Sequence, residues 1–486
     1  MISQCYSMKL KDVLKGIEIK QVKGNLDKNV SSITNDSRNA ANDGLFVAIK
    51  GVTVEGHLFI QSAINNGAEI VVYDKKVPEI SKAPNDVTFV KVENSRKALA
   101  FIAANYYGNY HKKMKVIGIT GTNGKTTTSE LTYQLLKKLG KKVGLISTVS
   151  AKFSGDEIDT GYHVTTPDAL NLHRLIHMMY ENGCEYLIIE TTSHGLDQHR
   201  TWGINFEVGA ITNITPEHLD YHKTFKNYLD AKARIFRQSK KIILNKYDPS
   251  LRKLIKKVPK NLSYEIADYT ELNFPVKFKA KFPGQYNLEN ASIAYNIVLC
   301  LTGDDILKNF SNLESVEGRM EKLETGRGFD VIIDFAHDAA ALEKVLLVIR
   351  KTTKNNLILV FGCAGLRDSR KRSKMGYLAI KLADKTVITA EDPRTEKLED
   401  INIQIESGVI RAGGHKSVDY FVIDDRQKAI SFAINKLAEN GDTVLITGKG
   451  HENSMCFGTT ELPWSDRKAV RRALKLNSSY DNRAVS

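Results

Sequence analysis

The sequence predicts an α/β protein in which helices cover both faces of mostly parallel sheets. Short apolar runs of strand length recur along the 486 residues, such as 116–120 (VIGIT) and 186–190 (YLIIE). Segments with apolar residues at helical spacing lie between such runs, as in 127–140, which ends in a glycine. A glycine-rich loop joins the strand at 116–120 to the helix that follows it. This alternation favours parallel sheets, because a parallel strand needs a long crossover connection that a helix supplies.

The expected strands fall into three regions of the chain. A chain of this length accommodates two to four domains. We place one boundary near residue 113 and another near residue 320, which gives domains 1–113, 114–320 and 321–486. The polar tail 477–486 is expected to be frayed. In chain order the expected strands are 45–49, 116–120, 143–147, 186–190, 208–212, 331–334, 357–362, 386–389 and 443–447.

The composition excludes several classes of protein. Lysine and arginine total 70 against 56 aspartate and glutamate residues, a formal net charge of +14. No clustered basic stripe with interleaved aromatic residues is visible, so no nucleic-acid partner is expected. The charge suits a solvated lysine-rich surface or the attraction of a small anionic substrate. The five cysteines are scattered and form no CxxC pair, which disfavours a disulfide framework or a zinc site. With no apolar stretch near the roughly 18–20 residues of a membrane span and no signal-peptide core, we expect a cytoplasmic protein.

The segment 121–128 (GTNGKTTT) is typical of a loop that binds nucleotide phosphates. Its glycines let backbone N–H groups approach phosphate oxygens, and the following helix adds a partial positive charge. Lys125 would reach the β- and γ-phosphates, and the hydroxyl of Thr126 or Thr127 would take Mg²⁺. Ile119 stands where the general pattern has a glycine, so a structural glycine turn is the alternative. The expected nucleotide-binding loop comprises Gly121, Thr122, Asn123, Gly124, Lys125, Thr126 and Thr127.

Many further motifs resemble those of the Mur ligases, and within that family the UDP-N-acetylmuramoyl-tripeptide synthetases. The resemblance extends over nearly the whole chain. Folylpolyglutamate synthetases share the loop, but they would not explain the motifs at 35–38, 193–200 or 391–394. The blocks that carry the resemblance are NDSR (35–38), TTPDAL (165–170), ETTSHGLDQHR (190–200), TNITPEHLDYHKTFKNYLDAKARIF (212–236), GQYNLENA (284–291), GRME (318–321), IIDFAHDAAALEKVL (332–346), FGCAGLRDSRKR (361–372), EDPRTE (391–396) and GKGHE (448–452).

The resemblance implies a three-domain enzyme of peptidoglycan synthesis. A central ATP-binding parallel sheet would lie between an N-terminal UDP-binding α/β domain and a C-terminal Rossmann-like domain. ATP would phosphorylate a substrate carboxylate, and an incoming amine would displace phosphate to form an amide. The implied substrates are UDP-N-acetylmuramoyl-L-alanyl-D-glutamate and a third amino acid, with ATP and Mg²⁺ as cofactors. A monomer is the expected state.

The resemblance gives catalytic roles to Lys125, Glu190, His218 and Lys232. Glu190 ends an apolar strand, where open α/β sheets bind ligands, and would hold Mg²⁺ together with Thr126. By themselves, His218 and Lys232 would be taken for a loop histidine and a solvated helical lysine. The matching family lysine is carbamylated, and a carbamate offers Mg²⁺ hard oxygen ligands that an ammonium cannot. A scaffold without catalysis is expected to have lost some of these four residues, and all are present.

Two further substrate sites are implied by the matching motifs. Val164 departs from the asparagine often found at its position, and Thr192 replaces a serine while keeping the hydroxyl. The additional ATP-site residues are Asn290, Arg319 and Asp334, with His337 a weaker candidate. The residues assigned to the UDP-sugar and dipeptide are Ser37, Arg38, Thr165, Thr166, Thr192, Gln198 and Arg200.

The amino-acid site is implied by Arg367, Asp392, Pro393, Arg394, Gly448 and Glu452. Family members that add meso-diaminopimelate carry DNPR, whose arginine binds the distant carboxylate. An arginine fork suits a carboxylate, so Arg394 favours diaminopimelate. Asp392 replaces the asparagine, and its charge leaves lysine open as the added amino acid. Leu366 and Asp338 are further departures from the family pattern.

Overall fold

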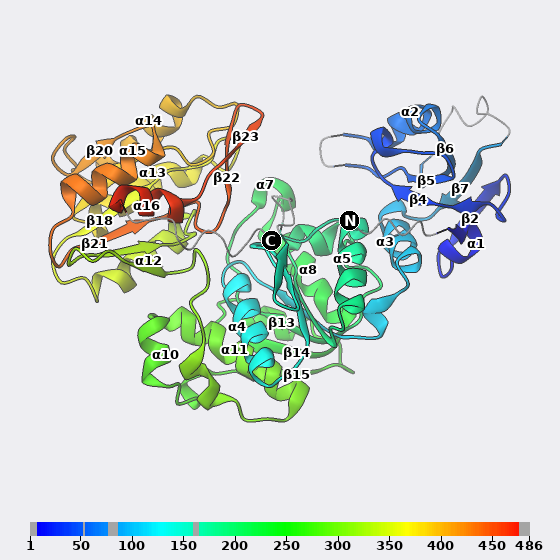
Figure 1. Ribbon diagram of the computed structural model, residues 1–486, viewed down its shortest axis with the longest axis horizontal. Helices are drawn as coiled ribbons and strands as arrows, with labels where there is room; N and C mark the ends of the chain where they lie inside the picture. The colour runs from blue at the N-terminus through cyan, green and yellow to red at the C-terminus, as the bar shows by residue number, and fades with distance from the viewer. Residues whose placement is uncertain (1–6, 52–53, 76–85, 159–164, 476–486) are drawn as a thin grey trace. The chain divides into compact units, whose positions relative to one another are not determined.

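The computed structural model describes residues 7–51, 54–75, 86–158 and 165–475. It divides into two compact units. The first comprises Met1–Asn273 with Glu289–Asn309, and the second comprises Phe274–Leu288 with Phe310–Ser486. Helix α11 (Gln285–Thr302) therefore contributes residues to both units. Figure 1 shows helices packed on sheets in each unit, which confirms the α/β fold class.

The first unit begins with a five-stranded sheet in the order β2-β7-β6-β5-β4. Neighbours from β4 to β7 are parallel, and β2 is an antiparallel edge. Leu45 and Val47 pack in the cluster that contains α3, whereas Phe46 packs in the cluster that contains α2. Burial on both faces explains why 45–49 is uniformly apolar instead of alternating. The elements are α1 (Leu10–Val13), β2 (Ile19–Lys23), β4 (Ser32–Thr34), β5 (Gly44–Val47), α2 (Ile60–Asn65), β6 (Ala68–Tyr73), β7 (Thr88–Val92) and α3 (Ser95–Tyr106), with a small β1 (Met8–Lys9) and β3 (Asn29–Val30) pair.

The same unit contains an eight-stranded sheet in the order β11-β10-β9-β12-β8-β13-β14-β15. Neighbours from β9 to β15 in this order are parallel, and β10 and β11 form an antiparallel edge. The strands are β8 (Lys115–Thr120), β9 (Val143–Ile146), β10 (Ala151–Phe153), β11 (Asp156–Ile158), β12 (Tyr186–Glu190), β13 (Phe206–Ile211), β14 (Ser239–Asn245) and β15 (Ser263–Ala267). The helices are α4 (Lys125–Lys138), α5 (Ala169–Glu181), α6 (Ser193–Asp197), α7 (Leu219–His222), α8 (Phe225–Ala233), the 3-10 segment η5 (Arg234–Gln238) and α9 (Leu251–Ile255).

The central strands of this sheet match the four strands expected between 116 and 212. β14 and β15 were not among the expected strands. β14 opens with the polar residues Ser-Lys-Lys, and β15 is a largely exposed edge, so neither reads as an apolar run.

The second unit is built on a six-stranded sheet in the order β16-β17-β21-β18-β19-β20. All neighbours are parallel except β16 and β17, and apolar clusters cover both faces. Its strands are β16 (Glu321–Glu324), β17 (Asp330–Ile333), β18 (Leu357–Phe361), β19 (Lys385–Ile388), β20 (Tyr420–Val422), β21 (Thr443–Ile446) and the hairpin β22 (Ser454–Phe457) with β23 (Thr460–Pro463). Its helices are α10 (Val276–Lys281), α12 (Ala339–Arg350), α13 (Arg370–Leu382), α14 (Leu398–Arg411), α15 (Arg426–Phe432) and α16 (Asp466–Leu474).

The predicted boundaries near residues 113 and 320 fall between these three sheets. β8 begins at Lys115 and β16 begins at Glu321. The division into domains 1–113, 114–320 and 321–486 stays a prediction. The tail expected to be frayed lies outside the described residues. None of the helices within the described ranges is long and apolar enough to span a bilayer.

Candidate active site

The loop between β8 and α4 is held tightly against its neighbours. Gly124 caps the N-terminus of α4 with a left-handed backbone, φ +84°, and a Cβ there would overlap the side-chain oxygen of Asn290. A Cβ on Gly121 would likewise overlap the hydroxyl of Thr212. Both glycines are therefore required by close packing, and the N–H groups at the start of α4 stay open for an anion.

Asn213 fixes the middle of the loop. Its carbonyl accepts from the backbone N–H of Thr122 at 2.7 Å, and its side-chain oxygen accepts from the N–H of Asn123 at 3.1 Å. The side-chain amide of Asn213 in turn donates to the carbonyl of Asn123 at 2.8 Å. These three bonds tie the loop to the segment that follows β13.

The carboxylate of Glu190 lies directly beside the start of α4. It is buried, with 1% of the residue exposed, and it accepts the Thr126 hydroxyl at 3.1 Å. Thr148, which follows β9, donates its backbone N–H at 3.0 Å and its hydroxyl at 2.9 Å to the same carboxylate. Carboxylate and hydroxyl oxygens gathered in this way are a donor set that suits Mg²⁺.

Two lysines meet the backbone of the loop. Lys125 Nζ donates to the carbonyl of Thr122 at 2.9 Å, and Lys232 Nζ donates to the carbonyl of Gly121 at 2.6 Å. Lys232 is 2% exposed. Burial, followed by the charge of Lys125, lowers the pKa of Lys232 well below its usual value. The amine of Lys232 is thereby shifted towards its neutral, nucleophilic form.

His218 occupies the turn before α7 in a left-handed conformation, φ 51°. Its ring contacts that of His194 edge-on, with centroids 4.8 Å apart. Burial, aided by the charge of His218, lowers the pKa of His194 to about 3. Asp248, which follows β14, is a second perturbed group near Lys232, since burial raises its pKa to about 6.

The predicted dipeptide residues of the central region form one connected group. The Thr166 hydroxyl donates to the Glu190 carbonyl at 3.0 Å and accepts the N–H of Thr192 at 2.9 Å. Arg200 donates to the carbonyl of Thr166 and, at 2.9 Å, to Gln198 Oε1. This places the group beside the carboxyl end of β12, where the nucleotide loop also lies. Thr165 joins it, because its hydroxyl lies 3.0 Å from that of Thr148.

The remaining predicted substrate residues lie elsewhere or outside the described ranges. Ser37 is buried in a 3-10 turn of the N-terminal sheet region, and the Arg38 side chain is 85% exposed and paired with Asp36 at 2.6 Å. The contacts described for these two residues do not join them to the dipeptide group. Val164 lies outside the described residues.

In the second unit, Asp334 organises the turn that carries Arg319. Its buried carboxylate accepts the N–H of Met320 and that of Ala336, each at 2.8 Å. Burial raises the pKa of Asp334. The Arg319 guanidinium lies over the Phe335 ring, 4.3 Å from its centroid. These two predicted ATP residues are thus brought together.

The predicted amino-acid site contains an ion-pair network around Lys449. Its buried ammonium lies 2.8 Å from Asp392 Oδ1 and 2.5 Å from Glu452 Oε2. Burial acts to lower the pKa of Lys449, but the two carboxylates outweigh it, and the pKa is raised. Asp392 Oδ1 also accepts the N–H of Cys456 at 3.0 Å. The additional charge of Asp392 is therefore compensated within the protein.

Arg394 is fixed by its backbone while its side chain keeps bonding capacity. Its φ is 55°, its N–H donates to the Cys456 carbonyl at 3.0 Å, and its carbonyl accepts from Gly458 at 2.8 Å. Its Nε is buried and has no hydrogen-bond partner among the described residues. Glu391 lies beside Gly448, and burial raises the pKa of its carboxyl group to about 7.

The other predicted positions of this region lie on nearby turns. Pro393 packs its carbonyl against Gly365, so that a Cβ on this glycine would overlap it. Leu366 is 63% exposed in a left-handed conformation, and Arg367 beside it is exposed. Asp338 caps the N-terminus of α12 by accepting from the N–H groups of residues 340 and 341.

A phosphate-binding loop at the carboxyl edge of a parallel sheet, backed by a buried carboxylate, defines a nucleotide-dependent α/β enzyme. Three Mur ligase sequence families match the chain: the family's catalytic domain at residues 29–107, its middle domain at 119–298 and its glutamate ligase domain at 318–450. The chain belongs to the Mur ligase family. It is therefore an ATP-dependent ligase that forms amide bonds.

The chain is 37% identical to UDP-N-acetylmuramoyl-L-alanyl-D-glutamate–2,6-diaminopimelate ligase of Clostridium tetani, over 96% of this chain and 99% of that protein. A solved structure with the same protein name is 25% identical, covers 96% of this chain and 99% of its own, and has a TM-score of 0.62. Folylpolyglutamate synthase of Mycobacterium tuberculosis, solved with ADP and AMPPCP, covers 72% of this chain and 92% of its own at 16% identity, with a TM-score of 0.59. This last likeness shows a shared fold alone.

Sequence reasoning missed Thr148, Asn213, Asp248 and Lys449. Thr148, Asn213 and Asp248 each follow a parallel strand of the eight-stranded sheet. The rule that ligands bind at the carboxyl edge of such a sheet would have selected Thr148 and Asn213, which directly follow the expected strands 143–147 and 208–212, but not Asp248, which follows the unexpected β14. Lys449 stood in the quoted block 448–452 and was not singled out, because its pairing with Asp392 spans 57 positions.

Replacing Gly124 by alanine should weaken ADP binding by tenfold or more. The added methyl group would overlap Asn290 and strain a left-handed backbone at the loop. Isothermal titration calorimetry with ADP measures the effect. Gly140→Ala is the matched control, since Gly140 is also left-handed, φ +71°, with nothing within 4 Å of its added Cβ. Equal ADP affinity in the Gly124→Ala protein would contradict the loop assignment.

Proposed function

We propose that this protein joins meso-diaminopimelate to UDP-N-acetylmuramoyl-L-alanyl-D-glutamate in peptidoglycan synthesis. The observation that carries the choice of amino acid is the fixed Arg394, whose buried Nε has no hydrogen-bond partner among the described residues. Relatives 34–37% identical along almost their whole length bear this ligase name. A cytoplasmic monomer, with residues 1–113 holding the UDP-sugar through Ser37 and Arg38, forms part of the same proposal.

The proposed reaction passes through an acyl phosphate. A carboxylate oxygen of the dipeptide attacks the γ-phosphorus of ATP, and the bond to the ADP oxygen breaks. The amine of the incoming amino acid then attacks the acyl carbon, phosphate leaves with the C–O electron pair, and the amine loses a proton. Lys125 and the loop N–H groups would neutralise phosphate charge and align the transfer. Thr166, Gln198 and Arg200 would orient the dipeptide carboxylate beside them.

Glu190 and Thr126 have the oxygen donors that a Mg²⁺ ion requires, and they lie within 3.1 Å of one another. When bound, Mg²⁺ neutralises phosphate charge during transfer. We assign His218 to a second ion on the strength of the family match alone. Lys232 would serve that ion as a carbamate, which its buried amine with a lowered pKa is suited to form.

Diaminopimelate suits the charges of the amino-acid site better than lysine does. Lys449 pairs with both Asp392 and Glu452, which leaves the network one net negative charge for the ammonium that either amino acid carries. Arg394 retains an unbonded buried Nε, and a buried guanidinium is stabilised by a carboxylate partner. A second carboxylate, which diaminopimelate has and lysine lacks, would supply that partner.

Phosphate release from ATP tests the proposed function. We expect release that requires both the UDP-dipeptide and meso-diaminopimelate, with L-lysine giving little. Lys125→Ala should abolish release while the UDP-dipeptide still binds, because the loop lysine serves ATP only. Release with lysine alone would keep the ligase and overturn the assigned amino acid.

Arg394→Ala should raise KM for diaminopimelate on the order of tenfold or more, since a charge-assisted bidentate contact is lost. KM for ATP should stay near its wild-type value. Steady-state kinetics with each substrate varied in turn give both constants. Arg411→Ala, an exposed arginine of the same unit, is the control. Equal rises in both constants would mean that Arg394 is structural.

Lys232 should carry a carbamate when the protein is supplied with ¹³C-bicarbonate. The neutral amine attacks carbon dioxide, one proton is released, and an N–C bond forms. A ¹³C carbamate resonance is the expected signal, and Lys232→Ala should remove it. Lys226→Ala, an exposed lysine of the same helix α8, should keep it. A protein without this resonance in bicarbonate buffer refutes the modification.

A further inference from the structure

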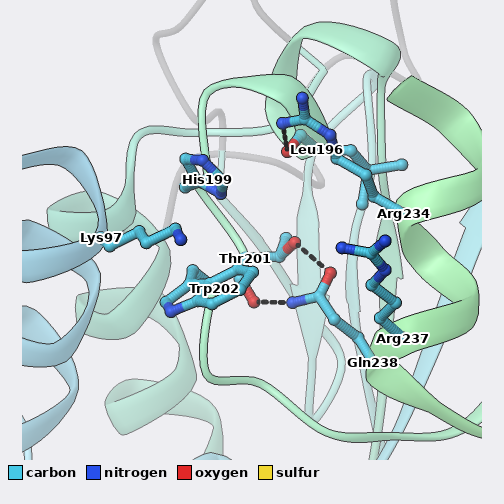
Figure 2. Close-up of a pocket in the computed structure, with 8 residues that line it drawn as sticks. All are labelled: Lys97, Leu196, His199, Thr201, Trp202, Arg234, Arg237 and Gln238. Atoms are coloured by element: carbon cyan, nitrogen blue, oxygen red, sulfur yellow. Dashed lines mark hydrogen bonds between the residues drawn. The ribbon is translucent and has the colours of Figure 1, made fainter. Parts of the chain in front are cut away.

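A pocket of about 220 Å³ lies behind the turn that carries Gln198 and Arg200. Figure 2 shows Lys97, His199 and Trp202 on one side of it and Arg234, Arg237 and Gln238 on the other. Lys97 comes from α3, and the arginines come from η5. All of these residues belong to the first unit. The lining is Lys97, Leu196, His199, Thr201, Trp202, Arg234, Arg237 and Gln238.

Every ionisable group on the pocket wall is basic. Arg234 is paired with Asp197, at 2.8 Å, but Asp197 does not line the pocket. Lys97 places its ammonium 4.4 Å from the centroid of the Trp202 ring. Within the described part of the chain, neither Lys97 nor Arg237 has a carboxylate at salt-bridge distance. Like charges around a confined space raise the local concentration of anions.

His199 adds an unused hydrogen-bonding group to the same wall. Its backbone is left-handed, φ 59°, and its Nδ1 is buried with no hydrogen-bond partner among the described residues. Burial, and then the charges of Arg234 and Lys97, lower the pKa of His199 to about 4. The neutral imidazole therefore adds no further charge to the pocket wall.

The wall is held in place before any ligand arrives. Arg234 Nη1 donates to the carbonyls of Leu196 at 3.4 Å and Asp197 at 2.9 Å. Gln238 donates to the Thr201 carbonyl at 2.6 Å and accepts the Thr201 hydroxyl at 3.3 Å. Figure 2 shows bonds of both residues as dashed lines. Fixed donors lose little freedom on binding, which favours affinity.

We propose that this pocket is a binding site for a small oxyanion of the phosphate type. Its volume is below the roughly 300 Å³ at which pockets begin to take drug-sized molecules, so the ligand is an ion or a compact phosphorylated group. Lys97 and Arg237 supply the charge. The site is separate from the nucleotide loop, whose lysine is Lys125.

Fluorescence of Trp202 provides a direct test, because the chain has only two tryptophans. In a Trp464→Phe protein, Trp202 is the sole reporter. Titration with inorganic phosphate should give a saturating change in Trp202 emission, which potassium chloride at matched ionic strength should not reproduce. A glucose phosphate is titrated in parallel. A change in Trp202 emission with both ligands means that the pocket accepts a phosphorylated metabolite, and a change with phosphate alone means that it accepts only the free ion.

Arg237→Gln should weaken phosphate binding about tenfold, through the loss of one charge-assisted contact. Arg252→Gln, an exposed arginine of α9, is the matched control and should bind as before. A thermal melt of each variant establishes that it is folded. Lys125→Ala should leave the Trp202 response intact. A response that follows ionic strength alone, survives Arg237→Gln unchanged or disappears in Lys125→Ala would overturn the proposal.

Discussion

The buried carboxylate of Glu190 is the group around which the nucleotide-binding edge is organised. Removing a charge from water is costly unless it is well hydrogen-bonded, and here three donors from Thr126 and Thr148 meet it. Thr126 comes from the first turn of α4, at the connection from β8, and Thr148 comes from the connection between β9 and β10. The parallel register of β9, β12 and β8 brings the two connections together. The hydrogen bonds that stabilise the Glu190 carboxylate therefore depend on the order of these strands.

The central features of this edge could be predicted from sequence because they are local. The strand, loop and helix around Gly124 are consecutive, and Glu190 ends an apolar run that reads plainly as a strand. The partners of these residues could not be found in the same way. Thr148 and Asn213 have no local pattern, and their roles depend on which strands become neighbours. β14 was missed for a related reason, since its polar start hides a strand that is buried only further along.

The substitution at Asp392 shows how a change of charge is absorbed. Viewed alone, an acid in place of an amide argues for a positively charged substrate. Lys449 instead binds both Asp392 and Glu452 from a buried position, and Cys456 adds a backbone donor. Lys449 is the buried member of this network, so removing either carboxylate would leave a buried ammonium with one partner fewer. The proposed preference for diaminopimelate therefore rests on Arg394, whose buried Nε has no partner among the described residues.

The turn from Leu196 to Thr201 lies between the group that contains Thr166 and Arg200 and the basic pocket described above. Gln198 and Arg200 bond to each other on the side of Thr166, whereas His199 between them faces the pocket of Figure 2. A left-handed residue at the centre of the turn lets neighbouring side chains point to opposite sides. Arg234 bonds to one end of this turn and Gln238 to the other, and both lie in η5, the segment that follows the helix of Lys232. An anion held behind the turn would therefore act on the same short segment that positions the dipeptide residues, and its influence would pass through hydrogen bonds that already exist.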